Sequence, residues 1–249
     1  MIEIGKKQIG ISGFAIRLFA VIFMAAGAAG YLLGYGYDWL ESFGWTSFSM
    51  FAFLLAEGVA HTTDKVLYFR RFLLFAIISE IIFDYMRVRK FIYWPISSAM
   101  ATLFTGFIIL LILSYVKKRF ENLVLDMILI AVLGYIAYRF TNYYNFEFGG
   151  FGIVIILMFY VARQVSYPKL LQLIVIFYIS FYLTKNVVLY VTIFGLQYPI
   201  APELYSLLSL PIIWMYDDER GPNMLWIQIL QYLVYPFTLA VMLFFRHFY

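Results

Sequence analysis

The sequence predicts an all-α integral membrane protein, a polytopic bundle of about nine transmembrane helices that forms a single transmembrane domain over residues 1–249. Hydrophobic residues make up 64% of the chain, only 13% of residues are charged, and the mean hydropathy is +0.87. Soluble domains are nearer to half apolar and a quarter charged. Several apolar runs also reach about 20 residues, the length that crosses roughly 30 Å of hydrocarbon.

Apolar runs broken by charged and turn residues predict the individual spans: 11–34, 46–63, 67–86, 95–116, 121–140, 150–164, 168–196, 201–216 and 223–246. The first follows Lys6 and Lys7 and is too long for the core of a signal peptide, so we expect it to be retained. The short turn at 62–65 makes the second and third spans antiparallel neighbours.

Three of these spans carry local features of their own. The seventh, 168–196, is interrupted by Lys185 and Asn186, and either one helix or two short pieces fits it. In the last span, Pro236 predicts a kink, because proline removes a backbone hydrogen bond. The first span has a small-residue face that lets another helix approach closely, within the chain or in a dimer: Gly27, Gly30 and Gly34.

Lysine and arginine are unevenly divided between alternate loops, which predicts the orientation in the membrane. The larger set lies on the side of the N-terminus: Lys6, Lys7, Lys65, Arg70, Arg71, Lys117, Lys118, Arg119, Arg163, Lys169 and Arg220. The smaller set lies on the other side: Arg87, Arg89, Lys90, Arg139, Lys185 and Arg246. Because cytoplasmic loops carry the excess of positive charge, we expect a cytoplasmic N-terminus and an external C-terminus. The cluster at 87–90 opposes this orientation.

The composition also excludes some chemistry. Without cysteine the chain has no disulfide, thiolate nucleophile or sulfur metal site. With two histidines a multi-histidine metal centre is nearly excluded, and we expect no metal. The net charge of +4 reflects cationic loops, so we expect membrane lipid rather than nucleic acid as a partner.

Ionisable residues inside apolar spans are costly and mark functional sites or structural pairs. Glu57 and His61 are four residues apart and share one face of the second span. An imidazole beside a carboxylate is the arrangement of an oriented general base, and the alternative is an interhelical hydrogen-bonding pair. Arg71, near the start of the third span, should lie at the depth of His61. These three residues predict a pocket on the cytoplasmic side.

A second acidic pair, Glu80 and Asp84, shares a face of the third span and should lie beyond that pocket. The pair fits substrate binding, proton carriage in a transporter, or a structural role in which one carboxyl is protonated or bound to Arg17. Thr105 fits the lining of the same cavity, although threonines in helices more often bond back to their own backbone.

The block "FAFLLAEGVAHTTDKVLYFRRFLLFAIISEIIFDYM" at 51–86 resembles the signature of the TraX family. The matching pairs are Glu57-Gly58, His61-Thr62, Tyr68 with Arg71, Ser79-Glu80 and Phe83-Asp84. Weaker matches follow in order: "LFT" at 103–105, "GGFGIVIILMFY" at 149–160, "LLSLPIIWMYDDERG" at 207–221 and "YLVYPF" at 232–237. Two positions depart from the family pattern. The Asp-His pair of the first helix is missing from 24–30, and Thr238 stands where a histidine often follows Tyr-Pro.

The resemblance implies a multi-span protein of the bacterial inner membrane that transfers an acetyl or other acyl group from acyl-CoA to an amine or hydroxyl. Acetyl-CoA would be the donor, and the acceptor would be a peptide or protein N-terminus or a glycan. We then expect His61 to act as the base, Glu57 to orient it, and Arg71 to face the thioester or the CoA phosphates. The alternatives are a non-catalytic relative that binds a peptide, lipid or partner subunit, and a proton-coupled transporter.

Overall fold

Helices form most of the protein. The computed structural model describes residues 10–183, 187–193, 196–219, 221 and 225–248. The long helices are α1 (Gly13–Leu33), α3 (Phe43–His61), α4 (Lys65–Val88), α5 (Ala99–Phe120), α6 (Leu123–Tyr143), α7 (Gly149–Ala162) and α10 (Leu225–Phe248). The shorter elements are α2 (Asp38–Glu41), α8 (Pro168–Tyr178), a π-helical turn (Ile179–Leu183), β1 (Leu189–Ile193), β2 (Leu196–Ile200), a 3-10 helix (Pro202–Ser209) and α9 (Leu210–Trp214). The expectations that involve Lys6, Lys7, Lys185, Asn186 and Arg220 lie outside the described residues.

Side-chain caps begin four of the long helices. The side chains of Ser12, Asp64, Ser98 and Asn122 each accept a hydrogen bond from a backbone N–H in the first turn of α1, α4, α5 and α6. Such a bond satisfies a donor that the helix itself leaves without a partner. The cap at Asp64 follows α3 after two residues, and so the tight turn predicted between the second and third spans is confirmed.

Among the residues that the structure describes, four helical stretches are long and apolar enough to cross a membrane: Gly13–Leu33, Asp38–His61, Ala99–Phe120 and Leu123–Tyr143. Shorter apolar helices cover Gly149–Ala162, Pro168–Phe181, Pro202–Ile213 and Leu233–Arg246. The all-helical class and the apolar spans therefore agree with the sequence, whereas a count of nine transmembrane helices is not confirmed.

The predicted seventh span, 168–196, is wrong as a single helix. α8 passes into the π-helical turn Ile179–Leu183, and the chain then forms an antiparallel hairpin in which Leu189 pairs with Ile200. Hydropathy alone could not distinguish a continuous helix from a helix followed by a hairpin, because the residues are apolar in both structures. The composition of the strands explains the result: β-branched and aromatic residues favour strands, and Pro199 cannot continue a helix.

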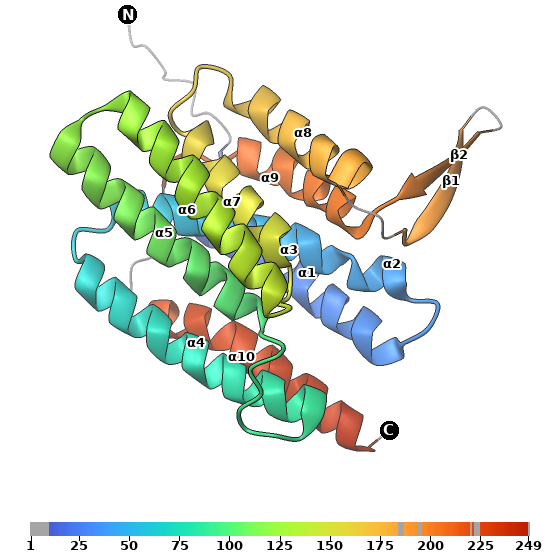
Figure 1. Cartoon of the computed structure of the whole chain (residues 1–249). Helices are drawn as coiled ribbons and strands as arrows, with labels where there is room; N and C mark the ends of the chain where they lie inside the picture. Colours follow the sequence, from blue (N-terminus) through green and yellow to red (C-terminus); the bar gives the residue numbers. More distant parts are fainter. Residues whose placement is uncertain (1–9, 184–186, 194–195, 220, 222–224, 249) are drawn as a thin grey trace, which may run out of the picture.

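Helix α3 lies at the centre of the bundle, and α1, α5, α7 and the 3-10 helix pack around it (Figure 1). α6 lies on the outside and leaves a long row of apolar side chains exposed: Leu123, Val124, Met127, Ile128, Val132, Tyr135 and Ile136. An exposed apolar face of this length suits contact with lipid rather than water. The hairpin projects from the bundle beside α2 (Figure 1).

The small residues of α1 pack within the chain. A Cβ on Gly27 would lie 2.9 Å from the backbone nitrogen of Gly44, and a Cβ on Gly30 would clash with the backbone nitrogen of Glu41. The close approach of α1 to the end of α2 and to the start of α3 therefore requires glycine at Gly27 and Gly30, which fits packing within the chain, whereas a Cβ on Gly34 would meet nothing within 4 Å.

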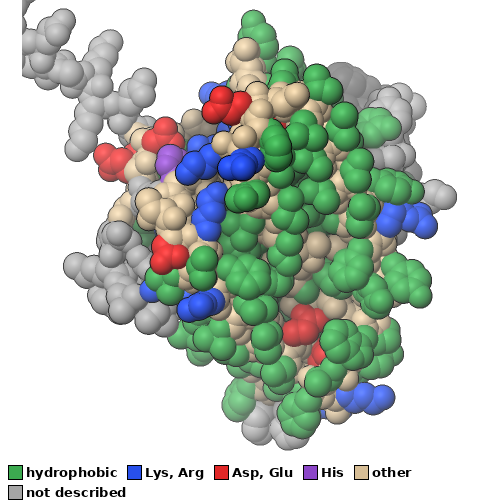
Figure 2. Space-filling view, turned by 60° about the vertical axis from the view of Figure 1, so that its left-hand side comes forward, with side chains coloured by type: hydrophobic (Ala, Val, Ile, Leu, Met, Phe, Trp, Pro, Cys, Tyr) green, Lys and Arg blue, Asp and Glu red, His purple; other side chains and the backbone are tan. Residues whose placement is uncertain are grey.

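The two ends of the bundle differ in charge. One end, called the basic end below, holds the starts of α1, α4 and α6 and the last turns of α3, α5 and α7. It carries Lys65, Arg70, Arg71, Lys117, Lys118, Arg119, Arg163 and Lys169, and Figure 2 shows Lys and Arg side chains gathered there. Arg246 of α10 donates to the Tyr31 hydroxyl, 3.2 Å, and to the Met86 carbonyl, 2.9 Å. These bonds place the last turns of α1, α4 and α10 together at the opposite end.

Candidate functional site

Glu57, His61 and Arg163 meet at the basic end. Oε2 of Glu57 lies 3.2 Å from Nε2 of His61, and Oε1 lies 2.5 Å from Nη1 of Arg163. The Arg163 guanidinium is also 3.5 Å from Nε2 of His61. The Glu57 side chain is 11% exposed and that of His61 is 41% exposed, so the carboxylate lies beneath a more accessible imidazole. The predicted contact between Glu57 and His61 is present.

The sequence analysis did not predict that Arg163 contacts Glu57 and His61. Arg163 directly follows α7 and was counted only as a cation of a loop. No local spacing connects it with Glu57, because the two residues are joined only by the packing of α7 against α3. Arg71, expected near His61, is half-buried on α4, and its role stays a prediction.

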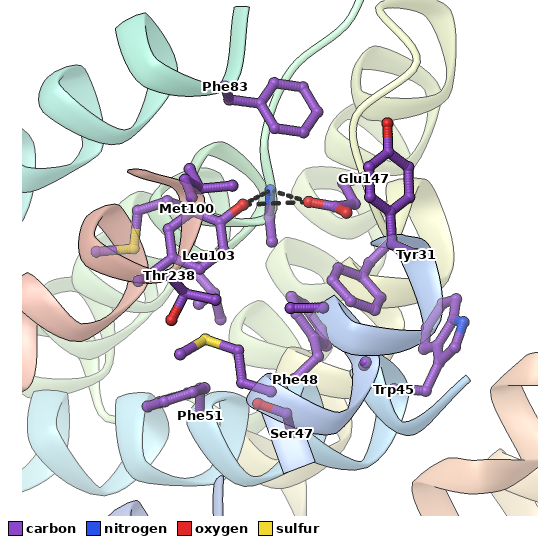
Figure 3. Close-up of a pocket in the computed structure, with 18 of the residues that line it drawn as sticks. Tyr31, Trp45, Ser47, Phe48, Phe51, Phe83, Met100, Leu103, Glu147 and Thr238 are labelled. Atoms are coloured by element: carbon purple, nitrogen blue, oxygen red, sulfur yellow. Dashed lines mark hydrogen bonds between the residues drawn. The ribbon is translucent and has the colours of Figure 1, made fainter. Parts of the chain in front are cut away.

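A cavity of about 480 Å³ lies on the other side of α3, between α1, α3, α4, α5 and α10 (Figure 3). Along α3 it extends from Gly44 to Leu55, about 17 Å at 1.5 Å per residue. Most of the lining side chains are apolar, and aromatic rings are prominent among them: Tyr31, Trp45, Phe48, Phe51, Tyr68, Phe72, Phe83 and Phe148.

Glu147 is the most ordered polar group of this cavity. Its Oε2 accepts hydrogen bonds from the backbone N–H of Ala99, 3.0 Å, and from the Tyr235 hydroxyl, 3.2 Å (Figure 3). Its own N–H donates to the Ser97 carbonyl, 2.8 Å, and its carbonyl accepts from the Thr102 hydroxyl. Burial raises the pKa of this carboxyl, and the positive charge of Arg87 partly offsets the rise.

Sequence reasoning also missed Glu147. It lies between α6 and α7, in the stretch "NFEFGG" at 145–150. An acidic residue in such a glycine-containing stretch predicts a solvent-exposed turn. The turn itself is unusual: Phe148 and Gly149 both have positive φ, 63° and 46°. This backbone returns the chain sharply into α7, and it turns the Glu147 side chain into the cavity instead of toward solvent.

Comparison with protein families supplies the identity. The model of the TraX family, described as TraX protein, matches residues 12–246. The chain belongs to the TraX family. Neither the curated proteins nor the solved structures contain a match to it. The suspected resemblance of the 51–86 block is thus confirmed over nearly the whole chain.

The positions that depart from the TraX pattern lie on the cavity wall. Met24, Gly27 and Ala28 of the first helix line the cavity, and so does Thr238 of the last. Thr238 donates back to the Val234 carbonyl of its own helix, 2.9 Å. The cavity wall is therefore apolar at Met24, Gly27 and Ala28, and Glu147 and Tyr235 are among the polar groups that line it.

A further TraX motif connects the cavity with the basic end. Tyr68 lines the cavity, and its hydroxyl would lie 2.8 Å from a Cβ built on Gly58. Glycine is thus needed next to Glu57 so that the ring of Tyr68 can close against α3. The ring of Tyr68 therefore lines the cavity and also contacts the turn of α3 that carries Glu57.

The remaining predicted site residues bond within the fold. Oε2 of Glu80 accepts from the backbone N–H, 3.1 Å, and the hydroxyl, 2.7 Å, of Ser98. Oδ2 of Asp84 accepts from the N–H of Tyr93, 2.7 Å. The two carboxylates thus fasten the 89–98 connection to α4, which fits the structural alternative. Thr105 donates to the Ala101 carbonyl, 2.9 Å, as helical threonines commonly do.

None of the six predicted residues lines the large cavity: His61, Glu57, Arg71, Glu80, Asp84 and Thr105. The expectation of one shared cavity is therefore not met there, because Glu80 is tied toward the opposite end through Ser98 while His61 lies at the basic end. The functional roles of the six residues stay predictions.

The basic end also offers three groups of the type that bind metals. Ligand atoms of Glu57, His61 and the exposed Asp218 lie within 4.8 Å of one another. The guanidinium of Arg163 already neutralises Glu57 at 2.5 Å, and its positive charge would repel a metal cation at that point. The cluster therefore suits proton transfer better than metal binding.

Proposed function

We propose that the chain is a TraX-type membrane acyltransferase that moves an acetyl group from acetyl-CoA to an amine or hydroxyl. The observation that carries the proposal is the contact between His61 and Glu57, reinforced by Arg163, at the basic end. A half-exposed imidazole held by a buried carboxylate is the arrangement of an oriented general base. Arg163 keeps Glu57 in place, and so we assign it the positioning role expected of a third member.

The nitrogen or oxygen of the acceptor attacks the thioester carbonyl, and its proton passes to the imidazole of His61. The new C–N or C–O bond forms as the C–S bond breaks, and the thiolate of CoA leaves and takes up a proton. A guanidinium near the carbonyl would stabilise the developing oxyanion. Arg71 is the arginine that the sequence suggests for this role, and Arg163, 3.5 Å from Nε2 of His61, is a second candidate.

Charge at the basic end supports a donor that carries phosphates. Arginine and lysine bind phosphate strongly through charge-assisted hydrogen bonds. The basic end is rich in both, and part of this charge stays on the surface in Figure 2. Because cytoplasmic loops carry the excess of positive charge, we place this end in the cytoplasm of a bacterial cell, at its inner membrane, where acetyl-CoA is made.

The test is to mix the purified protein with radiolabelled acetyl-CoA and a native membrane extract, and to identify the molecule that carries the label. We expect label on an amine or hydroxyl, together with release of one CoA per acetyl transferred. A protein that transfers no label to any fraction of the extract, and releases no CoA, would contradict the proposal and favour the non-catalytic alternative.

The transporter alternative depended on Glu80 and Asp84 as proton carriers. Both carboxylates accept backbone hydrogen bonds that hold the connection between α4 and α5. A carrier must exchange its proton with water on each side in turn, and protonation here would weaken the bonds that fix this connection. We therefore prefer acyl transfer.

A further inference from the structure

The large cavity has the dimensions and the walls of a site for one hydrocarbon chain. Its volume of about 480 Å³ falls within the range of small-molecule sites. The wall is largely aromatic and aliphatic, from Leu55 and Phe72 near the basic end to Phe83 and Met86 near the opposite end. A peptide would bury unsatisfied backbone groups against such a wall, whereas an alkyl chain has none.

Most of the charged groups that line the cavity lie at its opposite end, whereas Arg17, in the second turn of α1, lines it toward the basic end. At the opposite end, Asp38 and Glu41 belong to α2, Arg87 lies in the last turn of α4, and Glu147 lies two residues before α7. Exposed aromatic side chains surround this end: Tyr35, Tyr37, Trp39 and Trp94. Tyr and Trp gather at the level of lipid head groups. The mouth of the cavity therefore lies where a head group would be.

Glu147 presents an oxygen that is prepared to accept a hydrogen bond. Oε2 is fixed by Ala99 and Tyr235, whereas no group among the described residues donates to Oε1. The side chain lines the cavity, so Oε1 is available to a bound molecule. An ammonium group offers three N–H donors and a positive charge, which match a fixed carboxylate.

Arg87 is the complementary group at the rim. Its guanidinium lies over the rings of Tyr31, 4.8 Å, and Phe83, 5.4 Å, and no carboxylate of the described residues is within ion-pair distance of it. The rings hold the guanidinium in place and leave its N–H donors available. A planar guanidinium in this position suits a phosphate.

We propose that the cavity binds a lipid whose head group carries both a phosphate and a primary ammonium, as phosphoethanolamine does. One acyl chain lies along the apolar wall toward Tyr68, the ammonium donates to Glu147, and the phosphate meets Arg87. The proposal assigns a binding site and does not require acyl transfer, so the two can fail separately.

The experiment measures binding of three single-chain lipids with the same 16-carbon chain to the detergent-purified full chain by native mass spectrometry. The probes are lyso-phosphatidylethanolamine, lyso-phosphatidylcholine, whose quaternary nitrogen has no N–H, and lyso-phosphatidylglycerol, which has no ammonium. We expect the ethanolamine lipid to bind at least about tenfold more tightly than the other two, the ratio expected for a hydrogen bond to a charged group.

Variants connect this preference with the named residues. Glu147→Gln keeps an oxygen for Ala99 and Tyr235, and we expect it to remove the preference for ethanolamine over choline. Arg87→Gln should weaken all three lipids, because each carries a phosphate. Ala28→Phe, which fills the cavity from α1, should abolish binding of every chain. The control Glu121→Gln changes an exposed carboxyl at the end of α5 and should leave binding unchanged.

Each variant is compared with the wild-type protein by thermal unfolding, so that loss of binding is separated from loss of fold. Equal affinity for the three lipids in the wild-type protein would overturn the proposal. An ethanolamine preference that survives Glu147→Gln would overturn it as well, because the ammonium would then be recognised elsewhere.

Discussion

Replacement of Arg163 by an uncharged residue tests how much the free energy of unfolding depends on the counter-charge of the Glu57 carboxylate. In Arg163→Met, Glu57, whose side chain is 11% exposed in the wild-type protein, loses the guanidinium at 2.5 Å. A surface ion pair contributes about 0–1 kcal/mol, whereas breaking a buried pair costs about 3–5 kcal/mol. Glu57 is nearly buried and Arg163 is 32% exposed, so we expect an intermediate loss, about 1–3 kcal/mol of unfolding free energy.

The double variant Glu57→Gln with Arg163→Met tests whether the uncompensated charge of Glu57 causes the loss of stability. Most of the loss should come from the carboxylate that is left without its counter-charge, and not from the missing arginine contacts. Glu57→Gln removes that charge, so Glu57→Gln with Arg163→Met should be more stable than Arg163→Met alone. The coupling between the two sites should therefore be clearly non-zero, about 1 kcal/mol or more.

The assay is equilibrium unfolding in mixed micelles, followed by helical circular dichroism, for the wild-type protein, both single variants and the double variant. Lys117→Met serves as the matched control, because Lys117 bonds at the same end to the neutral Gln164, 2.6 Å, in an exposed position. The control should lose less than 1 kcal/mol. Additive effects of the Glu57 and Arg163 substitutions would refute the reasoning.

Gly30→Ala should destabilise the protein by about 1–3 kcal/mol in thermal or denaturant unfolding, because its Cβ would meet the backbone of Glu41. Gly34→Ala, with open space around it but φ of 76°, should act only through local strain. Equal small losses at both sites would contradict the packing of α1 on α2. Burial raises the pKa of Glu147, so the folded state holds its proton to higher pH than the unfolded state. The stability gained from this carboxyl is present below its ordinary pKa of 4.5 and is lost as pH rises through the folded value, so stability should fall less steeply over this range in Glu147→Gln than in the wild-type protein, and an unchanged slope would contradict the prediction. A reporter that is active only in the cytoplasm should be silent when fused after Tyr249 and active when fused before the N-terminus. The physical reason is that the start of α1 and the last turn of α10 lie at opposite ends of the bundle. The reverse pattern would contradict the predicted orientation in the membrane.

The sequence predicted the central part of the fold well, because the relevant signals are local. The apolar runs of α3 and α4, the turn between them and the i, i+4 pairing of Glu57 with His61 all depend on residues close together in the chain. Hydropathy failed at 168–196 for a physical reason. An apolar hairpin and an apolar helix have the same mean hydropathy, and only strand-favouring residues such as those around Val191 separate them.

The parts of the site that escaped prediction depend on contacts between distant segments. Arg163 and Glu147 both lie in connections, where a charged residue is normally solvated. Arg163 reaches Glu57 only after α7 packs on α3, and Glu147 reaches Tyr235 only after α10 closes the bundle. Glu80 and Asp84 show the converse. They looked functional because they lie inside a span, yet their partners are Ser98 and the backbone of the following connection.

The most direct test of acyl transfer at the basic end is the rate of acetyl transfer by His61→Gln relative to the wild-type protein, with the acceptor fixed as the molecule labelled by the wild type. Loss of a general base costs about 100-fold to 10,000-fold in rate, and glutamine keeps a polar side chain of similar size. We predict a loss in that range for His61→Gln with the fold intact, and an unchanged rate for the exposed control Glu121→Gln. A His61→Gln protein that transfers acetyl at more than about half the wild-type rate would contradict the account, because the base would then lie elsewhere.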